Sequence, residues 1–131
     1  MNKLVTILLA LVGFINFFPV LGVFGVSNLE TAYNIDIPSA DIALLLQHRA
    51  LLFGILGGFV LYSLFRKQHQ NVSMVLAGIS MLGFVVLFKT VGNNNPAILK
   101  VLYFDYVGLF LLGAAVVIKF YAAKSQASLN P

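Results

Sequence analysis

Residues 42–65 read IALLLQHRALLFGILGGFVLYSLF, and this stretch decides the fold. As a helix it is long enough to cross a bilayer core of about 30 Å, which takes roughly 20 apolar residues. Its only basic side chains are His48 and Arg49, and it contains no acidic residue. A membrane β-barrel would show short segments of alternating polarity instead of one continuous apolar run. The stretch therefore predicts a transmembrane helix.

Three further stretches have the same length and character. They cover residues 4–24, 72–91 and 97–121. Short polar segments separate the last three spans, and Asn95 and Pro96 suit the cap and the first position of the fourth helix. We expect an all-α fold, a four-transmembrane-helix bundle that forms a single integral membrane domain over residues 1–131.

The composition excludes most soluble classes. Hydrophobic residues make up 60% of the chain and charged residues 9%, against about 25% charged residues in soluble domains. The absence of Cys excludes thiol redox chemistry, thiolate metal sites and disulfides. The net charge of +4 comes from few, scattered basic residues. The positive-inside bias of membrane proteins accounts for them better than a nucleic-acid surface does.

The basic residues also predict an orientation. Four spans place both termini on one side, and more Lys and Arg residues fall on that side than on the other. The residues on the terminal side are Lys3, Arg66, Lys67, Lys119 and Lys124, and those on the opposite side are Arg49, Lys89 and Lys100. This bias predicts cytoplasmic termini and a multi-pass protein of a bacterial inner membrane. Because no A-x-A-like cleavage site follows the first span, we expect it to persist as a helix.

The first loop and the first span each carry a local signal. The sequence SNLE at 27–30 fits a capping box with Glu30 as its acidic member, so a short interfacial helix is expected near 28–33. Pro19 removes a backbone donor within the first span and predicts a kink. Asn16, three residues earlier, is expected to repair the kink locally, although it could also bridge two helices or contact a ligand.

Two opposite charges are predicted at similar depth in the outer half of the bundle. Counting outward from the cytoplasmic ends places Arg49 roughly 3 to 5 Å inside the outer boundary and Asp105 roughly 7 Å inside it. Charges at such depth are costly unless they pair or reach water. We expect a buried Arg49–Asp105 pair, with snorkelling of Arg49 to the interface as the alternative. The side chains expected to complete this polar cluster or to lie above it are His48, Gln47, Tyr103, Tyr106 and Glu30.

Small residues predict two packing faces. One runs along the second span, where residues recur at four-residue spacing: Ala50, Gly54 and Gly58. Its expected partner is the third span, through Ser73, Ala77 and Ser80. The other face carries Gly108, Leu112 and Ala115 together with Asp105 and should point inward. These faces permit a homo-oligomer without requiring one.

No catalytic or metal-binding motif is present. The two His, His48 and His69, are separated by nearly the whole second helix, roughly 30 Å, and cannot share a haem or metal within one chain. The sequence also lacks C-x-x-C, P-loop, H-E-x-x-H and G-x-S-x-G patterns. We therefore expect no catalytic residue, no metal and no cofactor.

The runs LLQHRA at 45–50 and LFGILG at 52–57 resemble those of uncharacterised small bacterial four-helix membrane proteins. The opening MNKL, the run NFFP at 16–19 and residues 100–108 are similar to theirs as well. The plan resembles DoxX-like and DUF4345-type proteins. Some such sequences carry the label phosphopantetheine adenylyltransferase. We exclude that activity, since this chain lacks both the H-x-G-H motif and the soluble nucleotide-binding fold of that enzyme family.

These features favour a non-enzymatic role. The preferred hypothesis is an accessory or ligand-binding membrane protein whose polar cluster binds a lipid, a quinone or a membrane partner. The first alternative is a proton- or ion-linked transporter or channel that uses Asp105, Arg49 and His48. The second is a subunit of a quinone-linked oxidoreductase. No interaction with nucleic acid is expected.

Overall fold

The computed structural model describes residues 3–92 and 94–129. Every element in this part of the chain is helical, which confirms the all-α prediction. The elements are α1 (Lys3–Phe17), η1 (Phe18–Phe24), α2 (Val26–Tyr33), α3 (Ala40–Phe65), η2 (Lys67–His69), α4 (Gln70–Val91) and α5 (Pro96–Leu129). Four of the helical segments are long and apolar enough to cross a membrane. These four segments are Lys3–Phe24, Ala40–Phe65, Lys67–Val91 and Pro96–Ser128.

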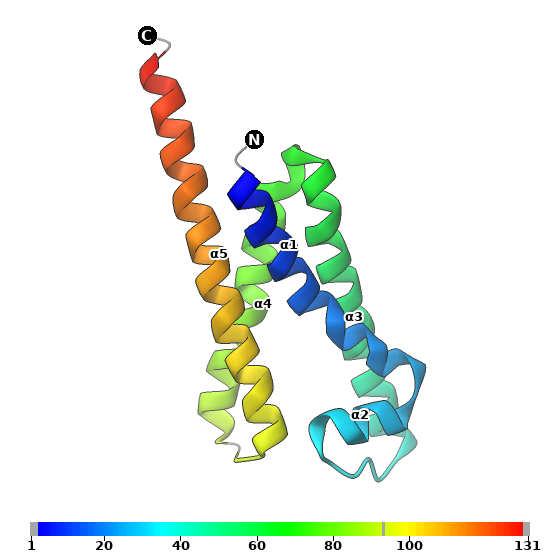
Figure 1. The fold of residues 1–131 in the computed structure, drawn as a ribbon. Coiled ribbons are helices and arrows are strands. Elements are labelled where there is room, and N and C mark those ends of the chain that lie inside the picture. Colours follow the sequence, from blue (N-terminus) through cyan, green and yellow to red (C-terminus); the bar gives the residue numbers. More distant parts are fainter. Residues whose placement is uncertain (1–2, 93, 130–131) are drawn as a thin grey trace.

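The four long helices form a ring in the order α1, α3, α4, α5 (Figure 1). Neighbours in this ring pack against each other, whereas α3 and α5 lie diagonally and have no close backbone approach. The start of α1 and the end of α5 lie at one end of the bundle, beyond which α5 projects, and α2 lies at the other. We call these the terminal end and the α2 end.

The bundle is apolar both inside and outside. Its interior is a cluster of buried residues that includes Leu9, Val12, Val60, Met81 and Ala115. Large apolar side chains also cover the exterior, as Phe110 does with 77% of its surface exposed. A bundle in water would expose a polar face instead. This exterior agrees with four helices that lie in lipid.

The closest helix approach uses a different partner from the one expected. A Cβ added at Gly57 would overlap the backbone of Phe17, and one added at Gly54 would overlap Val20. The small-residue face of α3, in which Ala50 is also buried, therefore packs on α1 and η1, so the expected pairing with α4 is wrong. Gly58 lies at the edge of this contact, because the helical turn brings Gly57 to its centre.

The first span changes geometry where Pro19 predicts it. The α-helix ends at Phe17, and the chain continues as a 3₁₀-helix that holds Pro19 in its first turn. The Asn16 side chain donates to the Val12 carbonyl at 2.9 Å and contacts the Met81 sulfur on α4 at 3.8 Å. Asn16 therefore both bonds to its own helix and bridges two helices. It does not bond to the Ile15 carbonyl, the group that Pro19 leaves without an amide donor.

The short helix in the first loop is confirmed, but its capping box is wrong. Helix α2 begins at Val26, so Ser27 lies inside it and makes no cap bond. The Glu30 carboxylate instead accepts a hydrogen bond from the Ile37 amide at 3.1 Å. This bond ties the loop that follows α2 back to the helix. At the start of α5, Asn95 Oδ1 accepts from the Ala97 amide at 2.9 Å, as predicted for a cap.

Candidate functional site

Helix α3 places Arg49 between three aromatic rings at the α2 end. Arg49 lies nine residues into α3, about 13 to 14 Å along its axis. Its guanidinium carbon is 4.9 Å from the centre of the Phe53 ring and 5.7 Å from the centres of the Tyr33 and Phe84 rings. Its Nη1 also donates to the Tyr33 hydroxyl at 3.0 Å. We call these four residues the Arg49 cluster.

The local sequence and the fold both contribute to this cluster. Phe53 follows Arg49 by four residues, and side chains at this spacing lie on the same face of a helix. Helices α2 and α4 bring Tyr33 and Phe84. The sequence reasoning missed all three rings. Only the spacing of Phe53 from Arg49 was a signal visible in the sequence.

The expected ion pair between Arg49 and Asp105 is wrong. In the described chain, Arg49 makes no ion pair with a carboxylate, and no residue there donates a hydrogen bond to Asp105. The reason is topological, because α3 and α5 lie diagonally in the bundle. Asp105 is half-buried on the inward face and still interacts electrostatically with Arg49. The predicted inward face of α5 is otherwise confirmed by the burial of Gly108, Leu112 and Ala115.

The remaining predicted members of the polar cluster lie apart from Arg49 and Asp105. The Gln47 amide donates to the Val23 carbonyl at 3.2 Å and so joins α3 to η1. His48 is exposed, and Tyr103 and Tyr106 are 59% and 40% exposed. None of these three side chains bonds to a described residue, so the expected hydrogen bonds to the charge pair are wrong. The position of each residue around its helix axis directs its side chain away from the bundle interior.

An open groove lies between α3 and α4 beside Arg49. Its volume is about 270 Å³. Its lining residues are Arg49, Leu52, Phe53, Leu56 and Ser80. The two helices join at the terminal end and diverge toward the α2 end (Figure 1). We call this feature the α3–α4 groove. It combines one cation and one hydroxyl with apolar walls.

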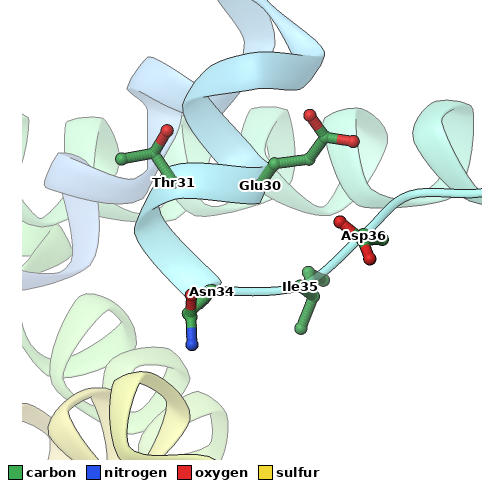
Figure 2. Close-up of a pocket in the computed structure, with 5 residues that line it drawn as sticks. All are labelled: Glu30, Thr31, Asn34, Ile35 and Asp36. Atoms are coloured by element: carbon green, nitrogen blue, oxygen red, sulfur yellow. The ribbon is translucent and has the colours of Figure 1, made fainter.

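A second depression, about 370 Å³ in volume, lies on the first loop (Figure 2). It is lined by Glu30, Thr31, Asn34, Ile35 and Asp36. Figure 2 shows the Glu30 and Thr31 side chains pointing away from each other and Asn34 at the end of α2, so the polar groups do not converge on one point. Glu30 therefore belongs to this depression and not to the Arg49 cluster. Among the residues described, no three His, Cys, Asp or Glu side chains gather as a metal site would require.

A polar cluster at the terminal end, buried at Ser63, Gln70 and Ser73 and more open at Asn71 and Lys119, was not anticipated from the sequence. The Ser73 hydroxyl donates to the Ser63 hydroxyl at 2.9 Å, and both residues are fully buried. Beside them, Lys119 Nζ donates to Gln70 Oε1 at 3.1 Å and to Asn71 Oδ1 at 2.8 Å. These bonds connect α3, α4 and α5. Satisfied buried polar groups of this kind stabilise a unique arrangement of helices.

No family model, curated protein or solved structure matches the chain. The chemistry of the site therefore has to indicate its role. The α3–α4 groove offers a cation held by aromatic faces, one hydroxyl and an apolar wall. Such a set can bind and orient an amphipathic molecule.

Proposed function

We propose that this chain is a membrane-embedded accessory or ligand-binding protein and that the α3–α4 groove is its binding site. The observation that carries the proposal is the position of Arg49 at the end of a groove whose walls are apolar. Binding sites for small molecules commonly combine apolar walls with a few placed polar groups. A lipid, a quinone or an apolar segment of a membrane partner has the matching amphipathic character.

The setting we propose is the inner membrane of a bacterium, with the α2 end facing outward. The excess of Lys and Arg residues at the terminal end supports this orientation through the positive-inside rule. The resemblance of the 45–57 region to uncharacterised small bacterial four-helix membrane proteins supports the same setting. In this orientation the α3–α4 groove opens toward the outer leaflet.

A proton-linked transporter is the second candidate, and Asp105 favours it. Asp105 is half-buried at membrane depth and receives no hydrogen bond from the described residues, and ionisable groups in such positions are functional candidates. However, Val60, Met74, Ala77, Leu112 and Ala115 are apolar and buried between the Arg49 cluster and the terminal-end cluster. A proton path through one chain would have to cross this layer, so the binding role is better supported.

Mass spectrometry of the molecules retained by the purified protein tests the proposal. Ser80→Phe places a bulky ring in the groove. The control Ile79→Phe places the same ring at the preceding residue, which is 64% exposed on the lipid-facing side. We expect Ser80→Phe to lose a retained amphiphile that both the wild type and Ile79→Phe keep. Equal retention in all three proteins would refute the groove as the binding site. A retained quinone would favour the oxidoreductase-subunit alternative.

A further inference from the structure

We propose that the α3–α4 groove selects an anionic phospholipid whose phosphate binds Arg49, with one acyl chain along Leu52 and Leu56. This inference rests on the proposed function and adds the chemical class of the ligand. It follows from the charge of the groove, from the donors that Arg49 presents and from the shape of the groove.

The first step is the charge of the groove. Arg49 is its only charged lining residue, and no described carboxylate forms an ion pair with it. Glu30 is bonded to the Ile37 amide in the loop. Asp105, on the diagonally opposite helix, interacts with Arg49 electrostatically but forms no ion pair or hydrogen bond with it. A cation at membrane depth is costly unless it forms a direct pair with a counter-charge or reaches water. An anionic ligand supplies that counter-charge, whereas a neutral quinone does not.

The second step is the geometry of the guanidinium. An arginine side chain has five N–H donors, and among the described residues only Tyr33 accepts one of them. The rings of Phe53, Tyr33 and Phe84 hold the cation without offering a charge to neutralise it. A planar fork of donors suits the paired oxygens of a phosphate, which it binds in a bidentate manner. The Arg49 cluster is therefore preorganised for an oxyanion.

The third step is the direction of the groove. Leu56 lies seven residues beyond Arg49 on α3, about 10 Å further from the α2 end. The charged group thus lies toward the membrane surface, and the apolar walls continue toward the bilayer centre, as in a phospholipid. Leu52 lines the groove and is still 51% exposed, so the groove is open along its side. An open groove of about 270 Å³ accommodates part of one chain, while the rest of that chain and the second chain stay in the bilayer.

Native mass spectrometry with added lipids tests this assignment. The wild type is titrated with dioleoyl phosphatidylglycerol, dioleoyl phosphatidylcholine, oleic acid and a ubiquinone. We expect at least a tenfold preference for phosphatidylglycerol over phosphatidylcholine, and the weakest retention for the quinone. Arg49→Gln should bring the ratio of the two phospholipids close to one, and Arg49→Lys should leave an intermediate ratio. Lys100→Gln removes an exposed cation near the α2 end of α5 and should leave the preference intact.

The outcomes separate this inference from the proposed function. A wild-type ratio near one, or a preference for oleic acid or the quinone, would overturn the phospholipid assignment. If Ser80→Phe still abolished retention of the bound molecule in that case, the α3–α4 groove would remain supported as the binding site. If Ser80→Phe and Arg49→Gln both kept the wild-type preference, both the groove as the binding site and the phospholipid as its ligand would be refuted. The wild-type titration decides the assignment even if an Arg49 variant fails to fold.

Discussion

The contact between α1 and α3 at Gly57 provides the sharpest test of the packing. A Cβ at Gly57 would overlap the backbone nitrogen of Phe17 and lie 2.5 Å from its Cα. Backbone atoms cannot rotate away as the end of a side chain can, so α1 and α3 would have to separate. At the neighbouring Gly58, the nearest atom to an added Cβ is Phe17 Cε2 at 3.9 Å, an ordinary van der Waals contact.

The two positions therefore predict opposite effects for the same substitution. Replacing Gly by Ala within a helix gains about 0.8 to 1.0 kcal/mol in helix propensity. Overpacking costs typically about 1 to 3 kcal/mol, and we expect the upper end at Gly57 because the overlap is with backbone. Gly57→Ala should thus lower the free energy of unfolding by about 2 kcal/mol. Gly58→Ala should raise it by up to about 1 kcal/mol, since only the propensity term applies.

Reversible unfolding in mixed micelles, titrated with SDS and followed by circular dichroism, measures both variants against the wild type. The Gly58→Ala variant is the matched control, because it makes the same chemical change one residue away on the same helix. The expected difference between the variants is about 3 kcal/mol, the sum of the two effects estimated above. Equal stability of Gly57→Ala and Gly58→Ala would refute the close approach at Gly57.

Three further substitutions test other contacts by the same unfolding assay. Tyr33→Phe keeps the ring but removes the acceptor for Arg49, and should cost about 1.5 to 3 kcal/mol as a bond to a charged group; wild-type stability would contradict that bond. Asn95→Ala removes the cap of α5 and the 2.8 Å bond to the Tyr33 carbonyl, and should cost about 1 to 2 kcal/mol; a loss well below that range would mean that neither bond contributes. Thr6→Val replaces a buried hydroxyl that has no partner in the described chain and should stabilise by up to about 1 kcal/mol; a clear destabilisation would reveal a partner for it.

The elements themselves were predictable because each depends on local chemistry. Continuous apolar runs predicted four long helices, and the start of α5 followed from Asn95 and Pro96. The change of geometry in the first span followed from Pro19. The capping box failed because several start positions near Ser27 satisfy the same pattern. Nothing in the pattern shows that the Glu30 carboxylate bonds to the returning loop.

The site was predictable only in part. Depth along each helix is a matter of counting residues, so Arg49 and Asp105 were correctly placed in the same half of the bundle. Whether they meet depends on which helices are neighbours, and counting does not provide that order. The rings around Arg49 come from α2, α3 and α4, and two of them are remote in sequence. The buried bond between Ser63 and Ser73 was missed for the same reason.

The amino-acid sequence alone determined that the chain forms long apolar helices and how far along each helix its charged residues lie. Both properties follow from hydrophobicity and from the fixed rise per residue of a helix. Only the tertiary structure decided the order of the helices around the bundle. That order set Arg49 against aromatic rings beside an open groove and left Asp105 on the diagonal helix. Helix order depends on the fit of whole surfaces, such as Gly57 against the Phe17 backbone, and local patterns do not encode that fit.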